Sequence, residues 1–410
     1  MFESLGLEHE VSKADFKAEE PVLRGELIDA QFDFLEAGEA PVIVLLGGMD
    51  PLGRSAAARQ LMSWMDSRHI RPYGTFAPSD EEADRPRMWR FWRALPRKGR
   101  IGIFLSSWYE APLRDYILGR IKRAKFRDRI DEILRFERML ADEGALFLKF
   151  MLLASNNQDL QDIKRRFRRM KHPNKKGGPV AWKLSDVDVE TGEAFFKRYD
   201  QCMEVVEELV STTSTDHAPW IPLASADRRY RDLTIGRTLR DAIRNRLEQA
   251  GPALPKTGAS AVISREGPNL LDALDLGKSL DRDDYKKRLD KEQRRLTALT
   301  LRKKFEDRAL VAVFEGNDAA GKGGAIRRVV QAMDPRMLRV IPIAAPSDEE
   351  KEQPYLWRFW RHIPRQGHIT IFDRSWYGRV LVERVEGFAS EADWMRAYDE
   401  IRSFEAELED

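Results

Sequence analysis

The chain has 410 residues, of which 70 are basic and 68 acidic, so its formal net charge is +2. This length is typical of two domains, and the balanced charge excludes the strong overall positive charge that is typical of nucleic-acid-binding proteins. Cys202 is the single cysteine, which excludes an intramolecular disulfide and a cysteine-based zinc site. We expect its thiol to be buried.

The N-terminal sequence MFESLGLEHEVSKADF carries acidic residues where a signal peptide has an apolar core. No apolar run approaches the ~20 residues that span a bilayer. The longest run, ALFLKFMLLA at 145–154, contains Lys149 and predicts a buried strand. We therefore expect a cytoplasmic protein with neither a membrane nor a nucleic acid as partner.

Two glycine-rich stretches are related by a constant offset: GGMDPLGRSAAA at 47–58 and EGNDAAGKGGAI at 315–326. Aligning Asp50 with Asp318 gives an offset of 318 − 50 = 268. The same offset aligns PSDEEADRPRMWRFWRALP with PSDEEKEQPYLWRFWRHIP, and IFLSSWYE with IFDRSWYG. The repeat is too long for a solenoid unit and predicts a duplicated domain.

We place the two domains at 1–250 and 270–410, joined by a stretch rich in Gly, Pro, Ser and Ala at 249–269. A charged helix near 283–306 is expected to begin the second copy. The second copy ends at Asp410, which aligns with Asp142, whereas the first copy continues for about another hundred residues. We therefore expect the second copy to be truncated at its C-terminus and the natural protein to be longer.

Each copy has the pattern of an α/β unit. The apolar runs APVIVLLGG and ALVAVFEG each lead into a glycine-rich turn and then a helix, and RIGIFLSSW and HITIFDRSW predict further buried strands. Alternating strands and helices predict parallel sheets sandwiched by helices. Ligands of such sheets bind at the carboxyl ends of the strands.

The loop of the second copy, GNDAAGK at 316–322, fits the core of a phosphate-binding P-loop. Its backbone N–H groups and the start of the following helix can surround phosphate oxygens, and Lys322 adds a positive charge. The loop residues expected at the phosphates are Gly316, Asn317, Ala320, Gly321, Lys322 and Gly323.

Two aspartates are candidate metal ligands. Gly323 follows Lys322 where a magnesium-binding hydroxyl is usual, and either Asp318 in the loop or Asp373 at the end of the strand HITIFD could replace that ligand. The competing interpretation is that one aspartate caps the helix and the other only ends the strand. The strand before the loop and the helix after it favour the site.

Arginines are expected at the same edge of the sheet, because the guanidinium fork binds phosphate oxygens bidentately. Arg374 follows Asp373 directly, and Arg379 is the next candidate. The remaining candidates are Arg358, Arg361, Arg365 and Arg384. For any single arginine a surface salt bridge is the competing interpretation, and the Trp and Phe residues between them are expected in the core.

The first copy has lost most of these groups. At the aligned positions Arg54, Leu105, Ser106 and Ala111 replace Lys322, Asp373, Arg374 and Arg379. Among the proposed phosphate and metal groups, Asp50 alone survives. Leucine cannot bind magnesium, so the first copy is expected to keep the fold without transferring phosphoryl groups.

The segments GNDAAGKGG and DRSWYGRVL, the block PSDEEKEQPYLWRFWRHIPRQG and the charged helix before them resemble the polyphosphate kinase 2 family. The tandem arrangement is similar to its class II, two-domain members, which are polyphosphate:AMP phosphotransferases. The resemblance implies tandem P-loop kinase domains related to thymidylate kinases. It also implies that the terminal phosphoryl group of inorganic polyphosphate is transferred to a nucleotide, with AMP as acceptor.

The same resemblance implies the roles of individual residues. Asp318 and Asp373 would hold Mg²⁺, or Mn²⁺ in its place, and Lys322 and Arg374 would contact phosphates. Family members also tend to self-associate. The family continues into a basic lid helix and a final strand that the second copy lacks, whereas the first copy has a lid-like run from Lys164 to Lys176.

Two alternatives stay open at this point. An ATP-dependent nucleotide or small-molecule kinase would use ATP rather than polyphosphate as donor. A polyanion-binding module without catalysis would keep its function when Lys322 is replaced by alanine.

Overall fold

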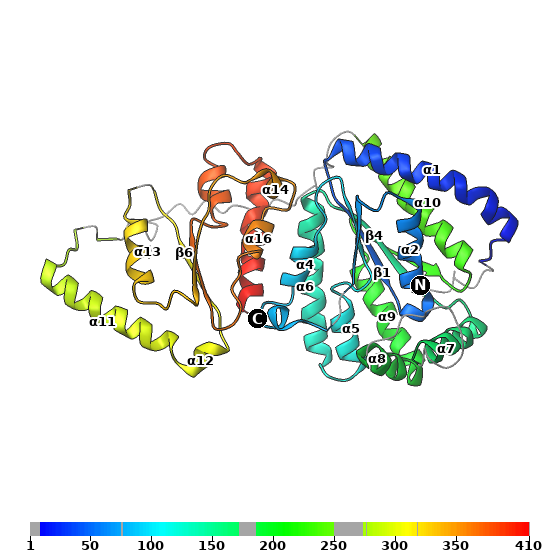
Figure 1. Ribbon diagram of the computed structural model, residues 1–410, viewed down its shortest axis with the longest axis horizontal. Helices are drawn as coiled ribbons and strands as arrows, with labels where there is room; N and C mark the ends of the chain where they lie inside the picture. Colours follow the sequence, from blue (N-terminus) through cyan, green and yellow to red (C-terminus); the bar gives the residue numbers. More distant parts are fainter. Residues whose placement is uncertain are drawn as a thin grey trace. The chain divides into compact units, whose positions relative to one another are not determined.

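The computed structural model describes residues 9–74, 77–171, 186–249, 274–275, 277–317 and 319–409, and Figure 1 shows their secondary structure. Asp318 therefore lies outside the described residues, as do 172–176 of the expected lid-like run and nearly all of the linker expected at 249–269. None of the helices in these ranges combines the length and the apolar character needed to cross a membrane.

The chain forms two compact units, which differ from the two copies of the repeat at two short segments. The first unit contains residues 1–78, 94–253 and 352–354, and the second contains 79–93, 254–351 and 355–410. Residues 79–93 thus belong by sequence to the first copy and by packing to the second unit.

The first unit contains a five-stranded parallel sheet in the order β2-β3-β1-β4-β5. Its strands are β1 (Val42–Gly47), β2 (Ile70–Tyr73), β3 (Ile101–Phe104), β4 (Leu146–Leu153) and β5 (Trp220–Ala224). The central strands β1 and β3 are buried along nearly their whole length because helices cover both faces of the sheet.

Helices α1 (Lys13–Ala37), α2 (Arg54–Trp64) and α10 (Arg228–Glu248) cover one face of this sheet. Alternate residues of β1 and β4, such as Val44 and Phe150, join the core on that face. The other described helices of this unit are α5 (Glu110–Ile117), α6 (Arg123–Asp142), α7 (Asn157–Lys171), α8 (Asp186–Lys197) and α9 (Tyr199–Thr213), and Ile163 of α7 also joins the core that α1, α2 and α10 form.

The run 145–154 forms β4, as predicted, and Lys149 in its centre is fully buried. Its Nζ lies 2.7 Å from Oε2 of Glu137 on α6 and donates a 2.8 Å hydrogen bond to the carbonyl oxygen of Thr213. Burial lowers the pKa of Lys149 and the Glu137 carboxylate opposes that shift. The lysine therefore belongs to a buried ion pair and does not interrupt the strand.

The second unit contains a three-stranded parallel sheet in the order β6-β8-β7. Its strands are β6 (Leu310–Phe314), β7 (Leu338–Pro342) and β8 (Ile369–Asp373). The repeat extends to strand pairing: Val42 pairs with Ile101 and Leu310 pairs with Ile369, and both residues are displaced by 268. The predicted duplication of an α/β domain with parallel sheets is confirmed.

Helices of the second unit follow the same correspondence. They are α11 (Arg282–Thr300), α12 (Lys303–Glu306), α13 (Lys322–Val330), α14 (Asp348–Lys351), α15 (Trp357–Trp360) and α16 (Glu391–Glu409). The helix expected at 283–306 is divided into α11 and α12. Among the described residues β6 pairs only with β8, and its residues are half-buried where those of β1 are buried.

The segment of the first copy that belongs to the second unit carries α3 (Asp80–Ala83) and most of α4 (Trp89–Ala94). Trp92 stacks on Trp360 with ring centroids 5.7 Å apart, and Arg85 Nε donates to the carbonyl oxygen of Ile363 at 3.1 Å. The prediction that these aromatic residues belong to the core is confirmed for Trp92, Phe359 and Trp360, which are all nearly inaccessible.

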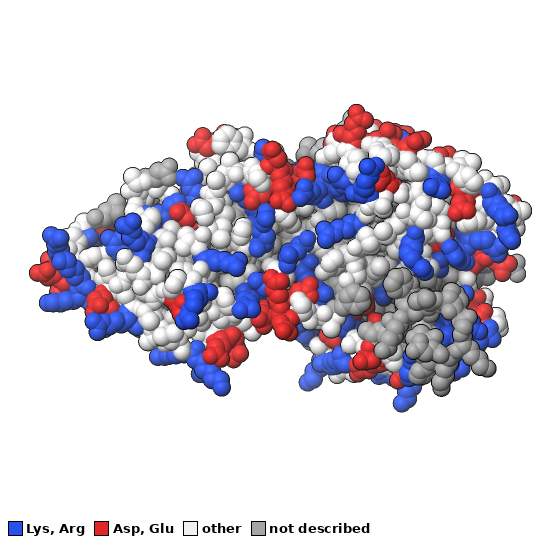
Figure 2. Space-filling model, in the orientation of Figure 1, with Lys and Arg blue, Asp and Glu red and all other residues white. Residues whose placement is uncertain are grey.

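Charged side chains of both signs alternate over the visible face of each unit, as Figure 2 shows. This distribution agrees with the formal net charge of +2. Cys202 on α9 is buried, as predicted, and burial raises the pKa of its thiol.

Candidate active site at the glycine-rich loop of the second copy

The loop between β6 and α13 presents backbone groups to solvent. Gly321 has φ +89° and directly precedes α13, so the first N–H groups of this helix, which have no intrahelical acceptors, point out of its N-terminus. The described loop residues from Gly316 to Gly321 are exposed. Exposed N–H groups and the positive end of a helix form an anion-binding surface.

Lys322 and Asp373 meet across the loop. Nζ of Lys322 lies 2.7 Å from Oδ1 of Asp373, which stands at the end of β8, next to β6 in the sheet. The two side chains are 13% and 32% exposed, so solvent reaches both. Oδ1 is buried and has no hydrogen bond with good geometry in the described part of the chain. The structure thus brings two of the residues that the sequence analysis proposed for this site together in an ion pair.

Strained backbone surrounds the same groups. Ala319 and Arg374 have φ of +68° and +65°, and within the described ranges no other residue except glycine has positive φ. The N–H of Arg374 donates to the carbonyl oxygen of Phe314 at the end of β6, which holds this conformation in place. Such strain concentrates at functional sites, where the surrounding structure compensates for it.

Two residues near the loop were not among the sequence candidates. Oγ of Ser375 donates a 2.7 Å hydrogen bond to Oε1 of Glu315, which directly precedes Gly316. The N–H of Tyr377 donates to the same Oγ at 3.2 Å. Glu315 thus connects the start of the loop to the segment after β8. Its aligned residue is Gly47, a difference that could have identified it from sequence.

Arg379 is held in one orientation by two residues that the sequence analysis also missed. Its guanidinium carbon lies 3.9 Å from the ring centroid of Tyr355, and Nη1 lies 2.9 Å from Oε2 of Glu383. The Tyr355 hydroxyl accepts from the N–H of Arg379 at 3.0 Å and donates to the carbonyl oxygen of Trp376 at 2.9 Å. Burial raises the pKa of Tyr355, so the hydroxyl keeps its proton.

The remaining arginine candidates have structural partners. Arg358 is buried and pairs with Glu350, and Arg361 pairs with Glu349. Arg384 lies 4.1 Å from the ring centroid of Trp394. Nε of Arg365 donates to Nδ1 of His368 at 3.4 Å. These contacts match the competing interpretation of surface or structural pairs.

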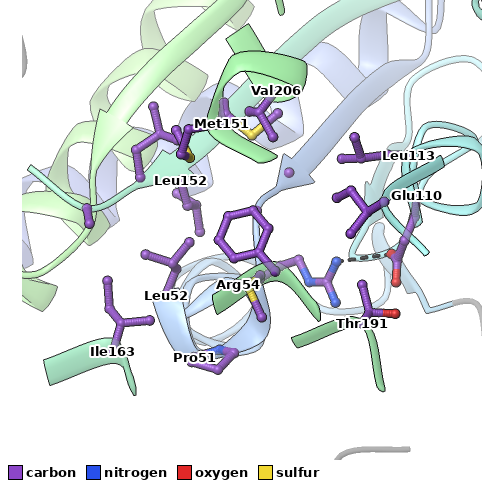
Figure 3. Close-up of a pocket in the computed structure, with 18 of the residues that line it drawn as sticks. Pro51, Leu52, Arg54, Glu110, Leu113, Met151, Leu152, Ile163, Thr191 and Val206 are labelled. Carbon is purple, nitrogen blue, oxygen red and sulfur yellow. Dashed lines mark hydrogen bonds and ion pairs between the residues drawn. The ribbon is translucent and has the colours of Figure 1, made fainter. Parts of the chain in front are cut away.

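The aligned site of the first copy is different. Nη1 of Arg54 pairs with Oε2 of Glu110 at 3.1 Å, and Figure 3 shows this pair at the edge of an apolar pocket. Leu105 and Ser106 stand where Asp373 and Arg374 stand in the second copy. Asp50 lies in the short helical turn Asp50–Leu52, and its side chain lies outside the described structure.

A metal site cannot be read from side-chain clusters alone. The described residues contain no group of three or more His, Cys, Asp and Glu side chains that could hold a metal ion. Asp318, one of the two expected ligands, is not among those residues.

A parallel sheet whose first strand ends in a glycine-rich loop, with a lysine and a carboxylate beside the loop and an arginine directly after that carboxylate, is the arrangement of α/β proteins that bind phosphate groups. The chain belongs to the polyphosphate kinase 2 family. The model of this family, described as polyphosphate kinase 2 (PPK2), matches residues 10–251 and 279–410.

Relatives and solved structures agree with this assignment. The chain is 47% identical over 409 residues to a polyphosphate:AMP phosphotransferase of Pseudomonas aeruginosa, covering 100% of this chain and 80% of the relative. It is 44% identical to a protein of the same name from Pseudomonas syringae pv. tomato, with the same coverage. A crystal structure of a polyphosphate kinase 2 from Pseudomonas aeruginosa superposes with a TM-score of 0.84 at 45% identity, covering 100% of this chain and 79% of that one.

Proposed function

We propose that the protein transfers the terminal phosphoryl group of inorganic polyphosphate to AMP, forming ADP, and that the second copy carries out the reaction. The observation that carries this proposal is the meeting of Lys322 and Asp373 at the exposed glycine-rich loop. Similarity over the whole chain to proteins named polyphosphate:AMP phosphotransferase supports the choice of donor and acceptor.

Phosphoryl transfer depends on aligning the reactants and neutralising charge. The N–H groups of Gly316 to Gly323 would hold phosphate oxygens as a P-loop does, and the ammonium of Lys322 would turn from Asp373 to the phosphates. The guanidinium groups of Arg374 and Arg379 would bind the phosphate groups on either side of the transferred one. No side chain needs to form a covalent intermediate.

Magnesium fits the acidic groups of this site. Oδ1 of Asp373 is a carboxylate oxygen that pairs with the Lys322 ammonium at 2.7 Å, and a carboxylate freed from this pair would suit a hard cation that prefers oxygen ligands. We propose that Asp373 and Asp318 hold Mg²⁺, with Mn²⁺ as a substitute. When bound, the ion would neutralise charge on the phosphate oxygens.

The test is nucleotide conversion, followed by chromatography, with polyphosphate, Mg²⁺ and AMP as substrates. We expect ADP from the unaltered chain and a loss of about 10²-fold or more for Lys322→Ala and Arg374→Ala, because each variant removes charge stabilisation. Ser106→Ala is the matched control, because Ser106 aligns with Arg374 in the first copy. It should leave the rate unchanged.

Two outcomes would contradict the proposal. If ATP supported conversion of AMP and polyphosphate did not, the donor would be wrong. If Ser106→Ala abolished ADP formation while Lys322→Ala did not, the reaction would belong to the first copy. A cytoplasmic location and self-association stay predictions.

A further inference from the structure

The first unit contains a cavity of about 150 Å³ beside its own glycine-rich stretch. Its walls come from that stretch, the end of β4, and helices α5, α7, α8 and α9. Figure 3 shows Leu52, Met151, Leu113 and Val206 arranged around it. The cavity therefore occupies the part of the first copy that corresponds to the candidate active site of the second copy.

Substitutions between the copies make this region apolar. Gly47, Met49 and Leu52 line the cavity, and the aligned residues of the second copy are Glu315, Asn317 and Ala320. The first copy thus has glycine in place of the Glu315 carboxylate and a methionine thioether in place of the Asn317 amide. It also has leucine in place of the smaller Ala320. Such a wall offers a phosphate group fewer polar side chains than the second copy does, so burying the phosphate there would cost more of its hydration.

Both arginines among the residues that line the cavity have carboxylate partners. Arg54 replaces the lysine of the loop, but its guanidinium pairs with Glu110 at 3.1 Å, and the side chains are 13% and 28% exposed. Leaving this pair to bind an anion would strand the Glu110 carboxylate. Arg114, another arginine that lines the cavity, lies 3.4 Å from a carboxylate oxygen of Asp115.

The loop itself is held from behind by a buried arginine. Arg231 on α10 is 2% exposed, and its Nη1 donates to the carbonyl oxygen of Leu52 at 3.3 Å. A Cβ atom added at Gly53 would lie 1.8 Å from the same Nη1, so the loop and the arginine are in close contact. Arg231 is in turn paired with Asp232 at 2.7 Å. The loop is thus fixed in a conformation that leaves the cavity open.

Two hydroxyl groups at the cavity wall have partners. The hydroxyl of Thr191 donates to the carbonyl oxygen of Val187 at 2.7 Å, and Oγ of Ser107 accepts from the N–H of Tyr109 at 3.4 Å. What faces the space is mainly aliphatic, aromatic and thioether groups. Methionines such as Met151 and Met203 can adjust to a ligand's shape.

We propose that the first copy binds a small, uncharged and mainly apolar molecule in this cavity. An apolar cavity of about this volume accepts a molecule the size of benzene, and the methionines at its wall can adjust to a somewhat larger ring system. The first copy is then a ligand site for uncharged, apolar molecules, whereas the glycine-rich loop of the second copy is proposed to bind phosphate groups. This inference does not depend on the proposed phosphotransferase activity.

The test is isothermal titration of the full chain with two probes, indole and inorganic tripolyphosphate. We expect indole to bind at one site and Val206→Phe, which fills the cavity from α9, to weaken it about tenfold or more. Leu113→Phe fills the cavity from α5 and gives an independent result if the first variant unfolds early. Thermal unfolding of each variant checks that the fold is kept.

Tripolyphosphate is the control ligand for the second copy. Its binding should be lost in Lys322→Ala and unchanged in Val206→Phe, since it is expected only in the second copy. No indole binding, or indole binding that survives both filling variants, would overturn the proposal. So would a tripolyphosphate site that persists in Lys322→Ala and disappears in Arg54→Ala.

Discussion

Nζ of Lys322 lies 2.7 Å from Oδ1 of Asp373, and the aligned residues of the first copy, Arg54 and Leu105, cannot form this pair. The two copies share strand order and register, so the difference arises from side chains and not from the fold. One chain therefore contains the site and a natural counterpart from which the charged pair has been removed.

The substitution Asp373→Leu places leucine where the first copy has Leu105, and so removes the carboxylate that pairs with Lys322. We expect ADP formation to fall by about 10²-fold to 10³-fold, because a leucine can hold neither a metal ion nor Lys322. The fold should persist, since Leu105 occupies the aligned position in the first copy. Steady-state rates and thermal unfolding check both statements. Unchanged turnover would exclude Asp373 from the site.

Arg374 can be tested for side-chain and backbone roles separately. Arg374→Gly and Arg374→Ala should both lose activity. Because φ at this position is +65°, glycine should be more stable than alanine by about 1 kcal/mol in urea unfolding. Equal stability of the two variants would mean that the backbone relaxes and that no strain is held there.

Tyr355 is predicted to act through Arg379. Tyr355→Phe keeps the ring 3.9 Å from the guanidinium and loses two hydrogen bonds, whereas Tyr355→Leu also loses the cation–π contact. We expect KM for polyphosphate to rise about fivefold for Phe and further for Leu, with a smaller change in kcat.

A double-mutant cycle separates positioning from general destabilisation. Once Arg379→Ala is present, Tyr355→Leu should change KM little further, because the group that it positions is gone. Additive effects of the two substitutions would show that Tyr355 does not work through Arg379.

The raised pKa of Tyr377 leads us to expect that the stability of the folded chain depends on pH. Burial and a 2.6 Å hydrogen bond to Glu405 raise its pKa to about 12 from an ordinary value of 10.0. Between these values the folded chain keeps a proton that the unfolded chain releases, so this contribution is complete below pH 10 and lost as pH rises toward 12. Urea unfolding of Tyr377→Phe should decline less steeply over that range, and an identical decline would contradict the prediction.

The buried pair of Lys149 and Glu137 can be removed singly or together. Lys149→Met leaves the Glu137 carboxylate buried without its cation and should lower the free energy of unfolding by about 3–5 kcal/mol. Adding Glu137→Gln should recover much of that loss, because no uncompensated charge remains. Chemical unfolding of Lys149→Met, Glu137→Gln and the double variant measures the coupling between the two side chains. If the double variant lost as much unfolding free energy as the two single variants together, the side chains would not be coupled.

Much of the fold follows from local sequence. Each buried strand is an apolar run that leads into a turn, and the offset of 268 carries these strands from one copy to the other with their register. The same offset separates the second loop, with Lys322, Asp373 and Arg374, from its degenerate counterpart. Residue types within a short segment determine these features.

Contacts between distant segments needed the tertiary structure. Tyr355 reaches Arg379 and Glu315 reaches Ser375 because helix and loop packing brings separate segments together. The inclusion of residues 79–93 in the second unit and the apolar cavity of the first copy arise in the same way. Sequence patterns specify which face of a strand or helix is apolar, but the packing of several elements at once decides which side chains meet.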